Sequence, residues 1–168
     1  MTLLDAPKFD DRKEKRTRII LWSGLGLFWV VLIGWWLVAG RPVDWPWYWN
    51  QHLRARNTMN AFLASVEKND LTTAYAVWHN DKNWQQHAPA KGPDTFDRFQ
   101  DNWSPDSPNN DYGAIQSHVI AAERRYGNGV ILAALINGRK SHALNLFYYP
   151  KNGTLDYLPP DTELYLGK

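Results

Sequence analysis

The strongest constraint on this chain is an uncharged apolar run at residues 19 to 39. As an α-helix, these 21 residues would measure about 30 Å, the thickness of a bilayer's hydrocarbon core. A cleaved signal peptide also has a basic start, but this run exceeds the usual signal length, and Trp35 and Trp36 stand where small residues would be needed for cleavage. A buried core helix fits less well, because tryptophans at both ends leave no amphipathic face. The run therefore predicts one transmembrane helix.

Basic residues gather on one side of this run. Residues 1 to 18 carry six basic and four acidic side chains, whereas only Arg41 follows the run closely. The positive-inside rule places the more basic flank in the cytoplasm. We therefore predict a single-pass protein of the cell membrane, with a cytoplasmic tail at 1–18 and an extracytoplasmic C-terminal domain. The residues predicted to set this topology are Arg12, Lys13, Lys15, Arg16 and Arg18.

The segment that follows, residues 40 to 49, is rich in tryptophan and proline. Indole rings favour headgroup depth, because they combine an apolar body with one N–H donor. Pro42 and Pro46 predict an extended backbone, with the next helix beginning at Asn50. We interpret the segment as a juxtamembrane linker. The aromatic residues predicted to lie at the membrane interface are Trp35, Trp36, Trp45, Trp47, Tyr48 and Trp49.

Residues 50 to 168 have the size of one compact domain. Their 12 basic and 12 acidic side chains cancel, and a neutral domain offers no electrostatic surface for phosphate backbones. Nucleic acid is therefore not an expected partner. The chain has no cysteine, which excludes disulfides, thiolate catalysis and Cys-ligated metal sites.

Three helices are predicted in the first half of this domain. Apolar residues recur at intervals of three and four from 50 to 68, and Asp70 can cap a second helix through its carboxylate. A third, short helix follows Pro93 and Asp94, and residues 104 to 111 form a loop. The apolar positions assigned to the second helix are Leu71, Ala74, Tyr75 and Trp78, and those assigned to the third are Phe96, Phe99 and Trp103.

Beyond Gly113 the apolar period changes to two, which is typical of strands. The intervening turns contain glycine, which supplies the positive φ that tight hairpins require. Helices followed by a meander of antiparallel strands define an α+β fold. Four strands are predicted, at 114–125, 129–137, 141–149 and 154–158.

This order of elements resembles the small cystatin-like cone domains of the nuclear-transport-factor-2-like superfamily, in particular bacterial membrane-tethered members without an assigned activity. The resemblance covers about residues 52 to 160. It implies a cone of about three helices packed on a four-stranded antiparallel sheet. The superfamily includes enzymes such as ketosteroid isomerase as well as binding and assembly modules, so the fold does not choose a function. The segments that carry the resemblance are Asn69-Asp70, Ala74-Tyr75-Ala76-Val77-Trp78 and Tyr112-Gly113-Ala114-Ile115.

Members of that superfamily that bind or convert small molecules keep the contacting side chains inside the cone. The positions here that would line such a ligand pocket are Tyr75, Trp78, Trp103 and Tyr148. Aromatic residues at helical spacing opposite a sheet are more often core, and this alternative stays open. The five histidines show no spacing that recurs in zinc sites, although His118 and His142 fall on strands that could bring them close together. We predict no catalytic residue, no metal and no cofactor.

These observations favour a non-enzymatic, membrane-anchored binding or assembly module. Its expected partners are the lipid bilayer, another membrane or extracytoplasmic protein, and a small apolar ligand. One alternative is an isomerase or dehydratase in which a His or Asp inside the cone abstracts a proton while Tyr75 or Tyr148 stabilises the oxyanion. Another is an accessory subunit of a membrane complex, with its span packed through Ser23, Gly26 and Gly34.

Overall fold

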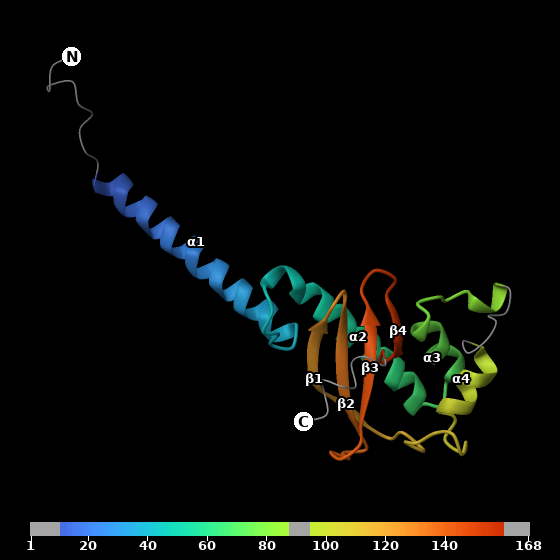
Figure 1. The fold of residues 1–168 in the computed structure, drawn as a ribbon. Helices are drawn as coiled ribbons and strands as arrows, with labels where there is room; N and C mark the ends of the chain where they lie inside the picture. The colour runs from blue at the N-terminus through green and yellow to red at the C-terminus, as the bar shows by residue number, and fades with distance from the viewer. Residues whose placement is uncertain (1–10, 88–94, 160–168) are drawn as a thin grey trace, which may run out of the picture. The chain divides into compact units, whose positions relative to one another are not determined.

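The computed structural model of the chain describes residues 11–87 and 95–159. The chain divides into two compact units, Met1–Val38 and Ala39–Lys168, and Figure 1 shows the elements of each. The second unit begins at Ala39, earlier than residue 50, where the sequence pattern predicts the start of the α+β domain.

The first unit contains α1, which runs Asp11–Val38 and is 28 residues long. It is long and apolar enough to cross a membrane, and most of its large apolar side chains are exposed. A signal sequence near an N-terminus has the same properties. The basic residues predicted to set topology lie in the first turns of α1, where Arg18 forms an ion pair with Glu14 at 2.8 Å.

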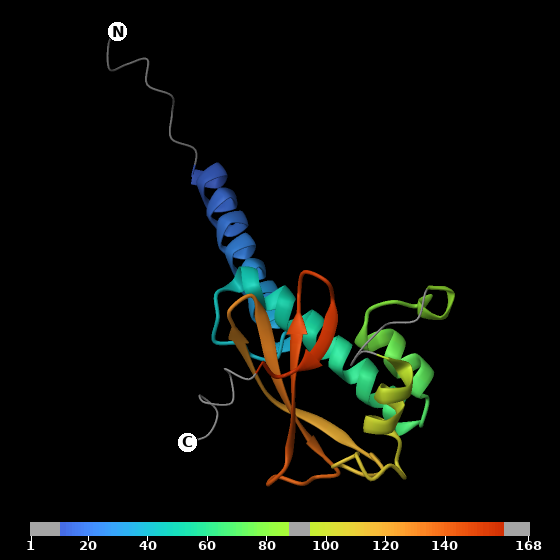
Figure 2. The ribbon, with the colours of Figure 1, turned by 45° about the vertical axis from the view of Figure 1, so that its right-hand side comes forward.

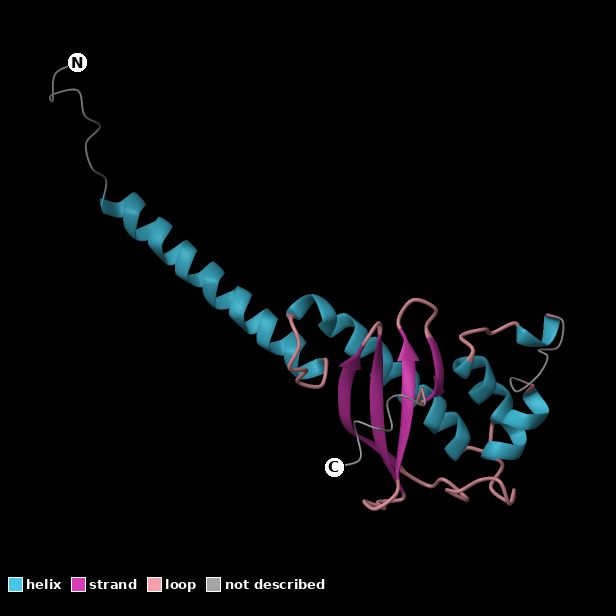
Figure 3. Ribbon diagram, in the orientation of Figure 1, coloured by secondary structure: helices cyan, strands magenta, loops and turns pink. Residues whose placement is uncertain are grey.

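The second unit carries a four-stranded antiparallel sheet, as predicted (Figure 3). Each strand pairs with the next along the chain, so the sheet is a simple meander. Asn137 and Gly138 have φ values of 52° and 70°, the two positive angles that a tight hairpin turn needs. The strands are β1 (His118–Tyr126), β2 (Gly129–Ile136), β3 (Ala143–Tyr149) and β4 (Thr154–Tyr157).

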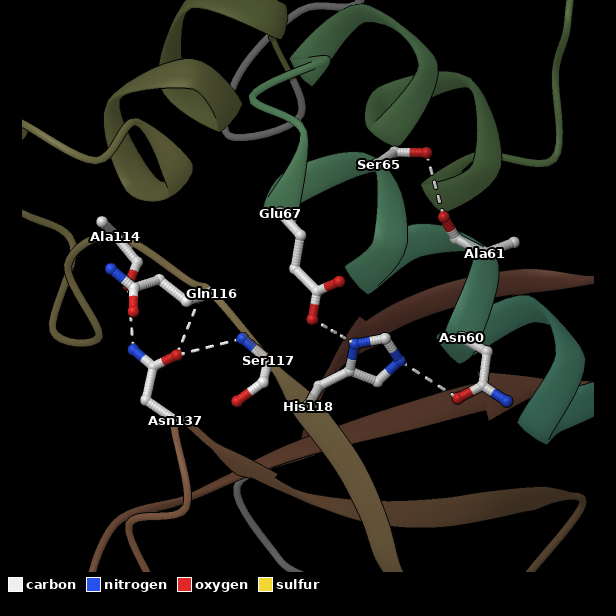
Figure 4. Close-up of polar contacts among 9 residues, drawn as sticks. All are labelled: Asn60, Ala61, Ser65, Glu67, Ala114, Gln116, Ser117, His118 and Asn137. Atoms are coloured by element: carbon white, nitrogen blue, oxygen red, sulfur yellow. Dashed lines mark hydrogen bonds and ion pairs between the residues drawn. The ribbon is translucent and has the colours of Figure 1, made fainter.

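The first strand begins four residues later than predicted. Residues 114 to 117 are irregular, because the side chain of Asn137 supplies the hydrogen bonds that a neighbouring strand would otherwise make (Figure 4). Its Oδ1 accepts from the backbone N–H groups of Gln116 and Ser117, and its Nδ2 donates to the carbonyl of Ala114 at 2.8 Å. The turn residue Asn137 therefore holds residues 114 to 117 in place before β1 begins.

The long helix of the second unit begins earlier than predicted. It is α2 (Pro46–Glu67), so the expectation of an extended backbone through Pro46 and a helix start at Asn50 is wrong. Proline is tolerated in the first helical turn, because the N–H that it lacks has no intrahelical acceptor there. Trp47, Tyr48 and Trp49 are consequently helical residues.

The two short helices follow the prediction closely. The carboxylate of Asp70 accepts from the N–H of Thr73 at 3.0 Å and caps α3 (Leu71–Trp78). Thr95 caps α4 (Phe96–Trp103), whereas Pro93 and Asp94 lie outside the described residues. A short 3₁₀ helix, η2 (Trp84–Gln86), lies between them in sequence.

The core lies between the helices and one face of the sheet, which α2 crosses (Figures 1 and 2). Phe62 of α2 is fully buried, with its ring centroid 5.1 Å from that of Trp78 and 4.9 Å from that of Trp103. On the sheet face that α2 crosses, β2 contributes Val130 and Leu132, both fully buried. Rings from α2, α3 and α4 thus meet in one aromatic cluster beside the sheet.

An irregularity in β1 decides which of its side chains face α2. Ile120 pairs with Ala134 and Ala122 pairs with Ala133, so Ala121 is an extra residue, a β-bulge. Cross-strand partners share a face of the sheet. Glu123, opposite the buried Leu132, therefore points toward the helix, as does Arg125 opposite Val130.

Candidate functional site

The residues that connect the two units, 39 to 45, fold into the second unit and are hereafter called the strap. Ala39 and Pro42 are buried. The indole N–H of Trp49 donates to the carbonyl of Asp44 at 2.8 Å, which ties the strap to the first turn of α2. Gly40, at a φ of 91°, lies so close to the sheet that an added Cβ would come within 2.5 Å of Glu123 Oε1. The strap is thus a folded part of the domain.

A buried histidine joins the strap to β1. His52 of α2 is only 1 % exposed, and its Nε2 lies 2.8 Å from Asp44 Oδ2. Its Nδ1 lies 3.5 Å from Glu123 Oε1, an ion-pair distance that is too long for a strong hydrogen bond. The ring therefore stands between two carboxylates that are far apart in the sequence.

Two arginines complete this cluster. Arg56 Nη1, one turn further along α2, lies 3.5 Å from Glu123 Oε2. The guanidinium of Arg125 lies 3.8 Å from the ring centroid of Tyr48, a cation–π contact. We call Asp44, His52, Arg56, Glu123 and Arg125 the junction cluster.

The buried members of the cluster have spare hydrogen-bonding capacity. The Glu123 side chain is 5 % exposed, and within the described residues neither of its carboxylate oxygens has a hydrogen-bond partner. The same holds for Nδ1 of His52 and Nε of Arg125. Buried polar atoms normally find partners, so this accumulation at one place marks the cluster as unusual.

The surroundings of His52 act on its pKa in opposite directions. Burial disfavours the charged ring and lowers the pKa, but the neighbouring carboxylates of Glu123 and Asp44 favour the imidazolium. The carboxylates prevail, and the pKa of His52 is raised above its usual 6.5. The folded chain therefore favours the charged form of His52 more than water favours that of a free imidazole.

A groove of about 660 Å³ opens beside the junction cluster. Its floor is small and apolar, formed by Ala122, Ile131 and Ala133 on the sheet face away from α2. Its remaining lining is polar or comes from the strap, namely Val43, Asp44, His52, Glu123, Arg124, Arg125 and Asn145. The groove therefore combines an apolar floor with charged walls.

The predicted pocket residues lie elsewhere. Tyr148 is 1 % exposed and belongs to the core, together with Tyr75, Trp78 and Trp103. Tyr75 and Trp78 also border a shallow hollow of about 350 Å³, and Trp103 borders another of about 450 Å³. The structure thus gathers these four side chains into the core, and three of them reach its surface hollows.

The tyrosine shared by these two hollows has an altered acidity. Tyr157 lines both, and its pKa is raised chiefly by burial, although a hydrogen bond from Asn102 Nδ2 at 3.3 Å acts in the opposite direction. A phenol with a raised pKa stays protonated at neutral pH and can donate a hydrogen bond.

The predicted interface aromatics divide into two groups. Trp45 and Trp47 are 68 % and 67 % exposed, and their rings stack with centroids 5.3 Å apart. Trp49, by contrast, is 7 % exposed and inside the domain, which corrects its assignment to the membrane interface. Tyr48 is half-buried beneath Arg125. The helix start at Pro46 explains this division, because successive helical side chains point about 100° apart. Trp35 and Trp36 lie on α1.

A second histidine also joins α2 to β1. His118 Nδ1 lies 2.7 Å from Glu67 Oε1, and its Nε2 lies 3.2 Å from Asn60 Oδ1 (Figure 4). His142 instead packs against Tyr112, with ring centroids 4.9 Å apart, so the structure gives the two histidines separate partners. Among the described residues no group of three His, Asp or Glu side chains is placed to hold a metal ion.

No sequence pattern points directly to the junction cluster. His52 and Glu123 are 71 positions apart, and strict alternation from Ile120 would turn Glu123 away from α2. Only the polar character of His52 on an otherwise apolar helix face could have drawn attention to it.

Comparison of the chain with protein-family models, with curated proteins and with solved structures gave no match. The resemblance to cystatin-like cone domains therefore stays a prediction, based on the order of the elements.

Proposed function

We propose that the protein is a single-pass membrane protein whose extracytoplasmic domain, of the cystatin-like cone type, is a non-enzymatic binding or assembly module. The groove beside the junction cluster would be its binding site. The partner would be a segment of another membrane or extracytoplasmic protein, or a small apolar ligand that lies on the apolar floor.

The observation that carries this proposal is the contrast between the interior and the groove. Aromatic and aliphatic side chains fill the space between the helices and the sheet, with Phe62 at its centre. The isomerase or dehydratase alternative needs an acid or base in that space. A hollow that combines an apolar floor with charged walls lies instead at β1, where Glu123 has unused acceptor capacity.

Two features support the membrane anchor. Most apolar side chains of α1 are exposed, and Trp45 of the strap forms an exposed, stacked pair with Trp47 of α2. Val43 beside them is fully exposed as well. Such apolar groups in water are costly, whereas at a bilayer interface they are favourable. On α1, a Cβ added at Gly26 or Gly34 would meet nothing, which leaves room for the span of another subunit.

The orientation can be tested with topology reporters fused at Thr2 and at Lys168. We expect the reporters to lie on opposite sides of the membrane, with the N-terminal one in the cytoplasm. Neutralising the five basic residues from Arg12 to Arg18 together should invert part of the population. Two reporters on the same side would contradict a single span.

The binding site can be tested with a photoreactive amino acid placed in the groove of the full chain in its native membrane. Replacing Ala133 should give a discrete adduct, because this residue lies on the groove floor. Replacing Lys151, an exposed turn residue, is the matched control and should give none. Equal adducts from the two positions, or none from Ala133, would contradict the proposal.

A further inference from the structure

The contacts of His52 with its two neighbouring carboxylates depend on the charge of the ring. An imidazole donates from both ring nitrogens only when it is protonated, and here each nitrogen faces a carboxylate. With the proton, the ring attracts Asp44 and Glu123 at once. Without it, one of the two carboxylates faces a nitrogen lone pair, and that contact becomes repulsive.

Every element packed around the ring contributes a charged or titratable group. Asp44 comes from the strap, Arg56 and Tyr48 come from α2, and Glu123 and Arg125 come from β1. Glu123 keeps Arg56 as a partner whatever the state of the histidine. Asp44 has no second cation among these contacts, so it depends on His52 for its charge partner.

Solvent access decides which carboxylate departs when the ring loses its proton. The Asp44 side chain is 34 % exposed, whereas the Glu123 side chain is 5 % exposed. Leaving an unpaired charge buried is far more costly than returning one to water. Asp44 is therefore the group that leaves, and the strap moves with it.

We propose that His52 is a proton-operated latch that holds the strap against β1 and α2 and so keeps one wall of the groove in place. Val43 and Asp44 form that wall, so release of the strap would widen the groove. The role of the groove in binding rests on the proposed function, whereas movement of the strap does not.

The direction of the switch follows from the sign of the pKa shift. The pKa of His52 is raised in the folded chain by Glu123 and Asp44 against the opposing effect of burial. The latch is therefore closed below the usual value of 6.5 and opens as the pH rises through the raised pKa.

The absence of cysteine allows a clean test. A single cysteine introduced at the exposed Val43 of the full chain carries a nitroxide, and its mobility is measured from about pH 5 to about pH 9. We expect the mobile fraction to rise with pH along a one-proton curve, the ratio of released to held strap changing by up to about tenfold per pH unit. Mobility that is independent of pH, or that falls as pH rises, would overturn the latch.

Three variants assign the transition. His52→Gln and Asp44→Asn should each remove it, because the first lacks the titrating ring and the second lacks the charge that responds. His118→Gln is the matched control, since His118 also pairs with a carboxylate but has no contact with the strap. If His52→Gln does not fold, Asp44→Asn alone decides. A transition that survives in Asp44→Asn, or one that disappears in His118→Gln, would overturn the proposal. If strap mobility shows the expected pH transition but Ala133 gives no adduct, the latch stands. Only the role of the groove as a binding site is then rejected.

Discussion

The two ends of α2 stabilise the domain in different ways. Toward its C-terminus, Phe62 packs among rings of α3 and α4, where dispersion and the hydrophobic effect dominate and no titrating group takes part in the ring contacts. Toward its N-terminus, His52 and Arg56 contact Glu123 and Asp44. Buried ion pairs add little net stability, but breaking one is costly. The aromatic cluster around Phe62 therefore supplies stability, whereas the junction cluster supplies sensitivity to the proton concentration.

The largest effect is expected at the aromatic end. Trp78→Ala or Trp103→Ala should lower the free energy of unfolding by about 3–5 kcal/mol, because each side chain is almost fully buried and leaves a cavity. Denaturant unfolding at two pH values measures this cost, which should be the same at both. A cost that changed with pH would remove the distinction between the two ends.

A smaller effect is expected where the strap meets the junction cluster. Gly40→Ala should cost about 1–3 kcal/mol, because the backbone has a positive φ and the new methyl group would collide with Arg56 and Glu123. Gly113→Ala is the matched control, since Gly113 also has a positive φ but faces open space. Unfolding measurements should show the larger loss at Gly40. Equal losses would show that the close approach to Glu123 is unimportant.

The pH dependence of stability sharpens the same contrast. His52 has a raised pKa in the folded chain, so its contribution is fully present below pH 6.5 and is lost as the pH rises through the folded-state value. The thermal midpoint should fall over that range. In His52→Gln this component of the fall should disappear, whereas Trp47→Ala should keep it. A midpoint that rose with pH in the wild type but not in His52→Gln would reverse the assignment.

The smallest effect is expected for the exposed stacked pair. Trp47→Ala should change the stability of the folded domain by less than about 0.5 kcal/mol, because Trp47 lies largely in solvent. Trp49→Ala should cost several times more, since Trp49 is buried and donates to Asp44. Thermal unfolding of both variants, prepared in the same detergent, makes the comparison. Similar losses at the two positions would place Trp47 in the core.

Local signals in the sequence predicted most of the fold. Asp70 caps a helix through its own carboxylate, and Asn137-Gly138 forms a turn through its own dihedral preferences, so both could be read from a few neighbouring residues. The period-two pattern likewise predicted a strand at 129–137, where the structure has β2. These features depend on residues that lie close to one another in the sequence.

The junction cluster depends on contacts that the sequence pattern does not record. Pro46 is compatible both with an extended linker and with the first turn of a helix, and only packing of Trp49 against the strap distinguishes them. The bulge at Ala121 carries no glycine or other marker, so the direction of Glu123 could not be predicted. The candidate site was therefore missed although the sheet that carries it was found.

The extra residue in β1 also determines which single-residue deletion this strand can tolerate. Removing one residue from a strand normally turns every later side chain to the opposite face. Without Ala121, however, β1 would become a regular strand in which Ile120, Glu123 and Arg125 still face α2. Deletion of Ala121 would therefore keep the same side chains of β1 facing α2. Deletion of Ala133 in β2, by contrast, would turn outward either Leu132 or the inward-facing residues that follow it. Natural length variation in this strand should be confined to the bulge.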